Sequence, residues 1–590
     1  MATISPLKQL QAADTLGSIS AILKIKPATL TFLLYKKDPL LRYTEFESPK
    51  RSGGKRQISA PSKDLKSLQR RVADLLQSCV NEISAETDRV DTVAHGFIAG
   101  RSIISNARPH VGKRYVFNLD LKDFFGTITF PRLYGYFMKD KNFLLPKKAA
   151  TILAQIACHN GKLPQGSPCS PVMSNLIGHI LDMHLVRLAA ENGCTYTRYA
   201  DDLTFSTNRP IFPEAIARRS DSETNGWVLG KQLAGLIKKC AFDVNHQKTR
   251  MQYRDSRQAV TGLTVNKKVN VSYEYRREVR AMVNSVLKSG GFHFNSTDID
   301  GAGVKTAVKT AGSLQQLHGM LNFVDWVSEF NLKLRRKNSY NFHKPIFEKP
   351  WKSSRLFLRF MLYRIFWAAE KPVIICEGKT DNVYLTHAIR SLAPSFPTLA
   401  EVDASGHISL KARLFKYTER STGRILQSVS GGSDGLCRLM RSYCAETKKF
   451  RVLGGLLPMI VLVDNDSGAT GKGKVYDTVE SLTEPTYKPT GHEQFIHVYR
   501  NLYVVATPLL GAKSSCIEDL FQKKDKVYMG KTFEPDCEKD TDKVFGKGTF
   551  AYKVVVPQAN SIDFINFKEL LEAVAAVMDH RSKALAAGAT

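Results

Sequence analysis

Two adjacent aspartates at a tight bend constrain this chain more than any other feature of its sequence. Asp201 and Asp202 follow Ala200 in the middle of residues 195–206, whose pattern predicts a β-hairpin. Adjacent carboxylates repel each other, and burying both costs several kcal/mol unless a cation lies between them. An isolated Asp-Asp pair in a turn is most often a solvated surface feature, so the surrounding sequence decides whether this bend is a site.

A third carboxylate, that of Asp120, extends the pattern. Residues 114–117 lead into a short apolar strand that ends at Asp120, and an Asp at the end of a strand can direct its carboxylate into a cleft. Together with Asp201 and Asp202 it would bind two Mg²⁺ ions roughly 3.5–4 Å apart. One ion activates a hydroxyl group and both stabilise the pentacovalent phosphate and the leaving pyrophosphate. The three acids therefore predict two-metal phosphoryl transfer.

The net charge indicates a polyanionic partner for the first two thirds of the chain. The formal charge is +30, from 85 Lys and Arg residues and 55 Asp and Glu residues. Residues 371–590 hold 29 basic and 25 acidic residues, so a surplus of 26 positive charges falls on residues 1–370. This surplus predicts nucleic-acid binding, although a basic surface that binds nothing stays open from charge alone.

The rest of the composition is that of a soluble globular protein, with 43% hydrophobic and 24% charged residues. No run of about 18 apolar residues occurs, and the N-terminus lacks the basic and apolar pattern of a signal peptide, so no membrane association is expected. The ten cysteines are scattered without a Cys-x-x-Cys pair. We therefore expect reduced thiols and a cytoplasmic location rather than disulfides or a zinc site.

The pattern along the chain predicts two domains and a linker. Short β-branched runs at 373–376 and 459–463 alternate with helical segments, which is typical of an α/β domain with a parallel sheet. We expect domains at 1–335 and 372–590 and a basic linker at 336–371. Helix-like patterns occupy residues 1–110, 147–158, 171–190 and 273–288, the last rich in Arg.

The three acids and their neighbours resemble the reverse transcriptases. In that family the palm carries a strand Asp and a Tyr-x-Asp-Asp hairpin, which Asp120 and Tyr199-Ala-Asp-Asp202 match. The resemblance implies a fingers-palm-thumb fold, RNA-directed DNA polymerase activity on dNTPs, and two Mg²⁺ ions. It assigns catalysis and metal binding to Asp120, Asp201 and Asp202.

Further residues match positions that handle the incoming nucleotide in this family. Leu163-Pro-Gln-Gly-Ser167 resembles the positioning loop, in which Gln165 and Gly166 would let the backbone approach the base. Phe125 matches the aromatic gate under the sugar that excludes a 2′-hydroxyl. Arg56 matches the fingers residue that grips the triphosphate, and Lys248 matches the lysine that protonates pyrophosphate. Either cation could instead be solvated.

Two short elements narrow the resemblance to the bacterial retron reverse transcriptases. Asn106-Ala-Arg-Pro-His110 and Val260-Thr-Gly262 match diagnostic elements of that group, and residues 95–102 are also similar. The match covers roughly residues 30–330. It implies a cognate structured noncoding RNA, priming from the 2′-hydroxyl of an internal guanosine, and a short single-stranded DNA branched from that RNA (msDNA).

The Arg-rich helix predicted at 273–288 is a candidate RNA-binding surface. Cations mixed with aromatics suit phosphate contacts and stacking on unpaired bases. The alternative is a helix packed on the palm with its arginines in water. The candidate residues are Tyr273, Tyr275, Arg276, Arg277 and Arg280.

Acidic residues follow both apolar runs of the C-terminal domain. Glu377 follows the first run, with Asp381 one turn into the next predicted helix, and Asp464 and Asp466 follow the second run. In a parallel sheet, adjacent strand ends would bring Glu377, Asp464 and Asp466 into one crevice. Such a group of acids predicts a Mg²⁺ or Mn²⁺ site.

This second pattern resembles the toprim domain of topoisomerases, primases and overcoming-lysogenization-defect nucleases, a Rossmann-like α/β fold. Glu377-Gly and Asp464-Asn-Asp466 match its two core motifs, and Glu518 resembles an acidic element of the nuclease branch. Lys547 loosely matches its phosphate-binding lysine. No strand-passage or zinc-ribbon segment is evident, so the resemblance implies metal-dependent cleavage of DNA or RNA. An inactive scaffold is the alternative.

The two resemblances together predict a multidomain α+β and α/β protein, a retron polymerase fused to a toprim nuclease. Retrons act in anti-phage defence, and here the fused nuclease would be the effector that the polymerase and its DNA–RNA product restrain or trigger. Masking between protomers would favour a homo-oligomer. The runner-up is a group II intron-like or diversity-generating reverse transcriptase with a non-catalytic toprim assembly domain. A third hypothesis is a nucleic-acid-binding assembly protein whose acids no longer work.

Overall fold

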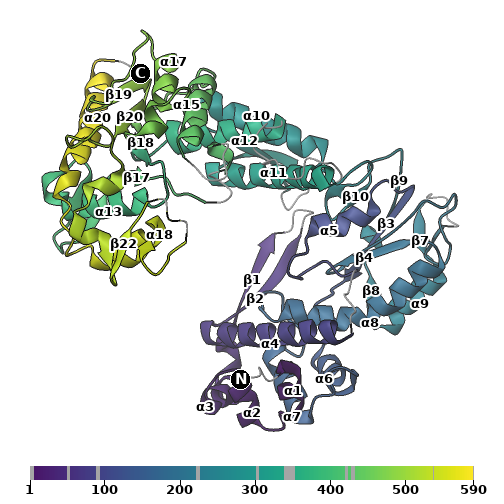
Figure 1. The fold of residues 1–590 in the computed structure, drawn as a ribbon. Helices are drawn as coiled ribbons and strands as arrows, with labels where there is room; N and C mark the ends of the chain where they lie inside the picture. The colour runs from purple at the N-terminus through teal and green to yellow at the C-terminus, as the bar shows by residue number, and fades with distance from the viewer. Residues whose placement is uncertain are drawn as a thin grey trace. The chain divides into compact units, whose positions relative to one another are not determined.

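The computed structural model divides into two compact units, Met1–Ser272 and Tyr273–Thr590 (Figure 1). The domain limits expected from the sequence stay a prediction. Within the expected linker, residues 338–351 lie outside the described part of the chain, and the helices α12 (Lys352–Leu362) and η5 (Tyr363–Trp367) follow. The described residues are 5–49, 54–87, 93–220, 226–299, 305–337, 352–418, 423–426, 432–535, 537 and 539–588.

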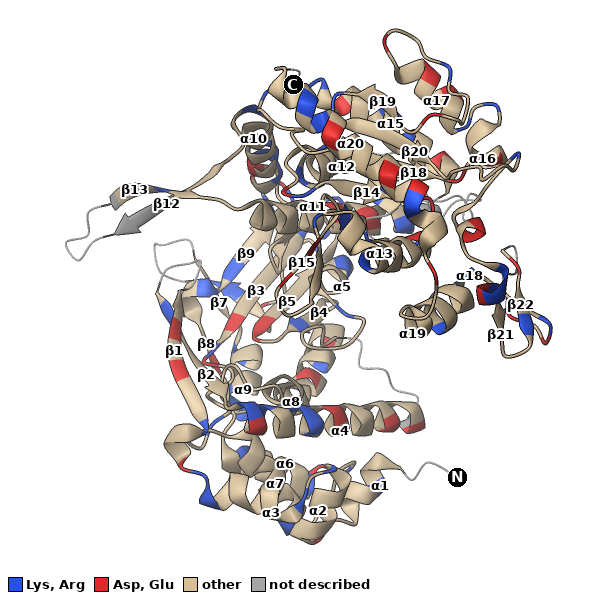
Figure 2. Ribbon diagram, turned by 90° about the vertical axis from the view of Figure 1, so that its left-hand side faces the viewer, with Lys and Arg blue, Asp and Glu red and all other residues tan. Residues whose placement is uncertain are grey.

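Helices and one β-hairpin form the start of the first unit. Strand β1 (Tyr43–Pro49) pairs antiparallel with β2 (Lys55–Pro61). The helix-like pattern over residues 1–110 missed this hairpin because most of its side chains are exposed, so no alternating buried face marks the strands. Figure 2 shows charges of both signs on it. The helices are α1 (Pro6–Gln11), α2 (Leu16–Ile22), α3 (Pro27–Thr31), η1 (Phe32–Lys36), η2 (Pro39–Leu41) and α4 (Lys63–Thr87).

An antiparallel sheet forms the centre of the first unit. Its order is β4-β5-β3-β8, and β9 also pairs with β3. The predicted hairpin over 195–206 is confirmed as β4 and β5, and the strand that was predicted to end at Asp120 continues two residues further. The strands are β3 (Tyr115–Lys122), β4 (Thr195–Tyr199), β5 (Asp202–Thr207), β8 (Asp243–Val244) and β9 (Arg250–Tyr253).

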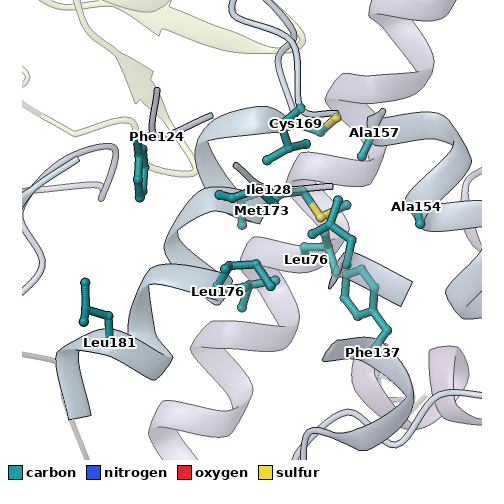
Figure 3. Packing of buried hydrophobic residues seen from close by; sticks show 14 of the residues in the cluster. Leu76, Phe124, Ile128, Phe137, Ala154, Ala157, Cys169, Met173, Leu176 and Leu181 are labelled. Atoms are coloured by element: carbon teal, nitrogen blue, oxygen red, sulfur yellow. The ribbon is translucent and has the colours of Figure 1, made fainter. Parts of the chain in front are cut away.

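Helices pack against this sheet and form the main core. The predicted helices at 147–158 and 171–190 are confirmed as α7 (Lys147–Ala157) and α8 (Ser170–Glu191). Figure 3 shows Leu76, Phe137, Met173 and Leu176 meeting between α4, α6 and α8. Burying one such side chain contributes about 1.5–3 kcal/mol, so the core gives the sheet a rigid support. The remaining elements are α5 (Ile103–Ala107), η3 (Arg108–His110), α6 (Phe130–Lys139), β6 (Ala217–Arg219), β7 (Trp227–Leu229), α9 (Lys231–Lys239), η4 (His246–Lys248), β10 (Ala259–Val260) and β11 (Leu263–Thr264).

The second unit begins with helices and an antiparallel pair of strands, β12 and β13. The predicted Arg-rich helix is confirmed as α10 (Tyr273–Ser289), and its last turn is joined to the rest of the unit by Arg451, whose backbone N–H donates to the Leu287 carbonyl at 2.9 Å. The other elements here are β12 (His293–Ile299), β13 (Lys305–Ala311) and α11 (Leu314–Lys337).

A mostly parallel sheet forms the centre of the second unit. Its order is β17-β14-β18-β20-β19, with only β19 antiparallel, which confirms the predicted α/β class. The strands are short and apolar because both faces of the sheet are buried. They are β14 (Val373–Ile375), β17 (Arg413–Leu414), β18 (Met459–Val463), β19 (Ile496–Tyr499) and β20 (Leu502–Ala506).

Helices and small sheets complete the second unit. Among the described residues, no single helix has the length and apolar character needed to cross a membrane; α2 with Pro27–Lys36 meets that criterion only as a sharply bent pair. The elements are α13 (Asp381–Ser391), η6 (Ala393–Ser395), β15 (Ala400–Val402), β16 (Ile408–Leu410), α15 (Ser433–Thr447), α16 (Ser467–Thr470), α17 (Val475–Leu482), η7 (Ile517–Leu520), η8 (Lys523–Lys526), β21 (Val527–Tyr528), β22 (Lys531–Phe533), β23 (Val544–Phe545), α18 (Lys547–Thr549), η9 (Phe550–Val555), α19 (Val556–Gln558), η10 (Ile565–Phe567) and α20 (Lys568–Ala586).

Candidate functional sites

The three aspartates of the first unit lie at one end of its sheet. Asp120 on β3 stands directly opposite Asp202 on β5, so their Cα atoms are about 4.5–5.5 Å apart. Asp201 lies in the turn before β5, where its carbonyl accepts a hydrogen bond from the Leu121 N–H at 2.9 Å. The turn requires a left-handed backbone at Ala200, with φ of 56°. The structure therefore brings the three acids together from two neighbouring strands.

The carboxylates repel one another in a partly buried setting. Burial, followed by the charges of Asp201 and Asp120, raises the pKa of Asp202 to about 6. Burial and the charge of Asp120 also raise the pKa of Asp201, while Lys248 and Arg56 oppose the rise. This excess of negative charge is stable only with a cation beside it. A divalent ion is the cation that three carboxylate oxygens suit.

Lys248 provides part of that positive charge. Its ammonium donates to Asp120 Oδ2 at 2.8 Å, and this hydrogen bond raises the pKa of Lys248. Asn245 also holds Asp120: its side-chain amide donates to Oδ1 at 3.3 Å and its backbone N–H donates to the Asp120 carbonyl at 2.8 Å. Asn245 was not among the residues predicted from the sequence, although it lies only three residues before Lys248.

A cavity of about 310 Å³ adjoins the aspartates. Asp120 and Asp202 line it on one side, and Thr261 and Gly262 of the Val-Thr-Gly element line it as well. Thr261 and Gly262 form the turn between β10 and β11, with φ of 45° and 80°. Arg250, which was not predicted from the sequence, also lines the cavity and lowers the pKa of Asp202.

The other predicted nucleotide-binding residues have different surroundings. Gly166, with φ of 124°, lies so close to β2 that a Cβ atom would be 2.8 Å from the Ser59 carbonyl oxygen, and the Ser59 N–H donates to the Gln165 carbonyl at 2.8 Å. The absence of a side chain at Gly166 thus lets the backbone of residues 165–166 lie against the β1–β2 hairpin. Phe125 is partly buried beside Phe124, with ring centroids 5.5 Å apart. Arg56 on β2 is exposed and acts electrostatically on Asp201.

Four of the five predicted RNA-binding residues of α10 face solvent at least in part, and the fifth packs against α11. Tyr273, Arg277 and Arg280 are exposed, and Arg276 is partly exposed. Tyr275 instead packs edge-on against Phe323 of α11, with ring centroids 5.9 Å apart. Positions 273, 276, 277 and 280 share one helical face, so four of the five residues form a basic surface with one exposed ring.

The acids of the second unit gather at the ends of β14 and β18. These strands are parallel neighbours, which brings Glu377 and Asp464 to the same edge. Asp464 Oδ1 accepts from the Ile517 N–H at 2.8 Å, Asp381 Oδ2 accepts from the Gly378 N–H at 2.7 Å, and Glu377 Oε1 accepts from the Ser433 N–H at 3.1 Å. Asp466 caps α16 by accepting from the Gly468 N–H at 2.7 Å.

Electrostatics show that these acids form one group. Burial, followed by the charges of Asp381 and Glu518, raises the pKa of Asp464 to about 8. Burial and Asp466 raise the pKa of Glu377. Glu518 is fully buried, and Lys547 lies 3.1 Å from its Oε1. Lys547 therefore neutralises the acid group from one side, as Lys248 does in the first unit.

Metal binding at either place requires side-chain rotation. Across the residues that the structure describes, no three His, Cys, Asp or Glu side chains are already arranged around a common metal position. Asp120 is turned to Lys248 and Glu518 to Lys547. Because the backbones of Asp120 and Asp202 are already paired, carboxylate rotation alone can bring their oxygens together. The all-oxygen donor sets fit Mg²⁺ or Mn²⁺.

The Asn-Ala-x-x-His element contributes a buried histidine. The His110 ring lies with Nδ1 2.6 Å from Ser206 Oγ and Nε2 2.8 Å from Thr197 Oγ1, behind β4 and β5. Burial, followed by the charges of Lys113 and His95, lowers its pKa to about 3. The element thus supports the strands that carry Asp201 and Asp202.

This buried histidine predicts a pH dependence of stability. An unfolded His binds a proton below about pH 6.5, whereas folded His110 stays neutral down to about pH 3. The contribution of His110 to stability is therefore fully present above the unfolded pKa. As the pH decreases from there towards the folded pKa, the free energy of unfolding falls by about 1.4 kcal/mol per pH unit. Urea unfolding curves between about pH 7.5 and 4.5 measure the slope. His110→Gln should reduce it, whereas exposed His246→Gln should not; equal slopes in both variants would contradict the prediction.

Comparison with known proteins identifies similar chains. The family model described as "Reverse transcriptase (RNA-dependent DNA polymerase)" matches residues 48–273. The retron Mx65 reverse transcriptase of Myxococcus xanthus is 37% identical over 274 residues, covering 44% of this chain and 59% of that protein. The retron Mx162 reverse transcriptase of the same organism is 32% identical over 334 residues, covering 53% and 63%. The retron Ec86 reverse transcriptase of Escherichia coli is 31% identical over 281 residues, covering 47% and 80%.

These matches have defined limits. The chain spans 59% and 63% of the length of the two Myxococcus proteins. The family match ends at residue 273, where the second compact unit begins. Among solved structures, a telomerase from Candida albicans is 11% identical, and the match covers 55% of this chain and 60% of the telomerase chain with a TM-score of 0.28.

Proposed function

Because this chain belongs to the retron reverse transcriptases, we propose that it is an RNA-directed DNA polymerase that copies a cognate structured noncoding RNA into branched single-stranded DNA. The observation that carries the proposal is the pairing of Asp120 with Asp202, beside Asp201 in the adjoining turn. Burial and the neighbouring carboxylates raise the pKa of Asp201 and Asp202, and this group of acids next to a cavity suits two-metal nucleotidyl transfer.

Each of these side chains would have its own role in the reaction. Asp120, Asp201 and Asp202 would hold two Mg²⁺ ions, which lower the pKa of the attacking hydroxyl and neutralise the developing phosphate charge. Lys248, whose ammonium already lies at Asp120, would donate a proton to the leaving pyrophosphate. Arg56 would contact the triphosphate, Gln165 and Gly166 the template base pair, and Phe125 the sugar; these last assignments rest on the family resemblance.

The exposed face of α10 would bind the RNA partner. Tyr273 is 69% exposed and stands one helical turn from Arg277, which combines a ring for stacking with a cation for phosphate. Priming from a 2′-hydroxyl of the RNA is part of this proposal, and it rests on the family resemblance. We further propose a cytoplasmic location, because the ten cysteines are scattered along the sequence without a Cys-x-x-Cys pair.

Purification of the protein with its RNA tests the polymerase proposal. We expect a short DNA to co-purify and to stay joined to RNA until debranching or ribonuclease treatment releases it. A parallel preparation that lacks the noncoding RNA gene is the control and should yield no such DNA. A parent protein that carries neither DNA nor polymerase activity on an added RNA template would contradict the proposal.

For the second unit we propose a toprim-type nuclease that cleaves DNA or RNA with Mg²⁺ or Mn²⁺. The supporting observation is the group of Glu377, Asp381, Asp464 and Glu518 at one edge of a parallel sheet, with Lys547 beside it. Glu377 and Asp464, with Asp381, Asp466 and Glu518, would bind the ions, and Lys547 would contact the scissile phosphate. The raised pKa of Asp464 indicates that its carboxyl group needs a cation to ionise at neutral pH.

The nuclease would act as the effector in anti-phage defence, under control of the bound RNA–DNA product. The arrangement of the second unit supports such control. A buried ion pair joins Asp325 of α11 to Arg424, and eight residues further along the chain the Gly432 N–H donates to the Glu377 carbonyl at 3.3 Å. A change at α11 would thus act on Arg424, which lies eight residues before the Gly432 contact with Glu377. We expect a homo-oligomer, because protomers that pair could mask one another's nuclease site.

One observation favours a second candidate function. Glu518 is held by Lys547, and the described acids do not surround a common metal position. This suits a non-catalytic toprim domain used for assembly, attached to the retron polymerase rather than to the group II intron-like or diversity-generating enzyme that the sequence had left open. Metal-dependent cleavage by the purified protein separates the two candidates, because the assembly domain would show none.

A further inference from the structure

An arginine is completely buried directly behind the aspartate turn. Arg198, the penultimate residue of β4, is 1% exposed. Its guanidinium donates to Asp182 of α8 from Nε to Oδ1 at 2.8 Å and to Oδ2 at 3.0 Å, and from Nη2 to Oδ2 at 2.7 Å. Tyr196 donates its hydroxyl to the same Oδ1 at 2.8 Å. Asp182 is thus the fixed partner that sets the plane of the guanidinium.

The third nitrogen of Arg198 reaches the turn itself. Nη1 donates to the Ala200 carbonyl at 3.3 Å and to Asn175 Oδ1 at 3.3 Å. The Ala200 carbonyl belongs to the peptide that joins Ala200 to Asp201, so its direction determines how Asp201 leaves the turn. Asn175 continues the network, since its side-chain amide donates to the Gly96 carbonyl at 2.9 Å. The guanidinium therefore connects α8 to the peptide before the catalytic pair.

Two glycines leave the space that this arrangement requires. A Cβ atom at Gly178 of α8 would lie 2.8 Å from Arg198 Cζ, so any other residue there would displace the guanidinium. A Cβ atom at Gly96 would lie 2.6 Å from the Ala200 nitrogen. The first glycine lies in the interior of a helix, where glycine is unfavourable, which indicates that the space has a purpose beyond helix formation.

A buried ion pair alone gives little net stability, because desolvation of both charges offsets their attraction. Apolar residues would join β4 to α8 equally well, but only a guanidinium can hold Asp182, Asn175 and the Ala200 carbonyl together. We propose that Arg198, oriented by Asp182, is a positioning residue for Asp201, and that it directs this carboxylate towards the metal ions by fixing the Ala200–Asp201 peptide. The inference rests on the proposed polymerase function.

Gly178→Ala gives the sharpest test. The added methyl group displaces the guanidinium but leaves its charge and all of its partners in place. The substitution also favours the helix over the unfolded chain, so it opposes a general loss of stability. Gly235→Ala in α9 is the matched control, because a Cβ atom there meets nothing within 4 Å. Arg198→Lys, alone and combined with Gly178→Ala, completes the set.

The measurements are kcat and KM for dNTP, the Mn²⁺ binding that Asp201→Asn removes (followed by electron paramagnetic resonance), and Tm. Gly178→Ala should lower kcat at least about tenfold and weaken that Mn²⁺ binding, with Tm no lower than that of Gly235→Ala. Arg198→Lys should show the same pattern. The double variant should be no worse than Arg198→Lys, because the shorter cation no longer occupies the space beside residue 178.

Two results would overturn the inference. One is a Gly178→Ala protein with the kcat and Mn²⁺ binding of Gly235→Ala. The other is a loss of activity that only accompanies a lower Tm. A parent protein that makes no DNA but loses Mn²⁺ binding on Asp201→Asn would reject the polymerase proposal alone, and the Mn²⁺ titrations would still decide the role of Arg198. A parent with no Asp201-dependent Mn²⁺ binding would reject both.

Discussion

Asp201→Asn is expected to abolish DNA synthesis, with a loss in kcat of at least about 10³-fold, while the protein stays folded. The substitution preserves the shape of the side chain and removes one of the three negative charges that would hold the metal ions. Burial and Asp120 already raise the pKa of Asp201, so the carboxylate is unfavourable in the metal-free fold. Its removal should therefore leave Tm unchanged or raise it.

Primer extension on an RNA template and the amount of co-purifying DNA measure this effect. Asp255→Asn is the matched control, because Asp255 is exposed and lines none of the cavity beside Asp120 and Asp202. It should retain parental activity. A normal DNA yield from Asp201→Asn would show that the aspartate turn is not the polymerase site.

Glu377→Ala is expected to remove metal-dependent nucleic-acid cleavage and protection from phage, without reducing DNA synthesis. Glu377 follows β14 at the edge where Asp464 follows β18, so its loss deprives the ions of one ligand at the sheet edge. We expect the cleavage rate to fall by at least about 10²-fold. Chelation of divalent ions by EDTA should lower the cleavage rate of the parent protein to a similar extent, and it should stop DNA synthesis as well.

Cleavage of labelled DNA and RNA, measured with Mg²⁺ or Mn²⁺, and plaque counts on cells carrying each variant provide the readouts. Glu401→Ala on the exposed strand β15 is the control and should behave as the parent does. Equal protection by the parent and Glu377→Ala would reject the effector hypothesis, whereas cleavage that persists in Glu377→Ala would reject the site.

Local sequence was sufficient for the elements that carry the aspartates. The bend at Asp201 and Asp202, the strand containing Asp120, and the helices α7, α8 and α10 follow from periodicity within a single segment. The β1–β2 hairpin could not be predicted from periodicity, because its strands are mostly exposed and lack an alternation of buried and exposed residues.

Tertiary structure decided which further side chains contact the aspartates and through which atoms. Lys248 and Asn245 contact Asp120 although they lie more than a hundred residues away in the sequence. Thr261 and Gly262 line the cavity beside the aspartates. Arg198 of β4 donates to Asp182 of α8. Residue patterns encode the periodicity of one helix or strand, whereas partners of this kind are set by the packing of whole elements around a common core. The sequence by itself determined that three acids would share one sheet end; the packed fold decided that a lysine lies beside them and that a buried arginine lies behind them.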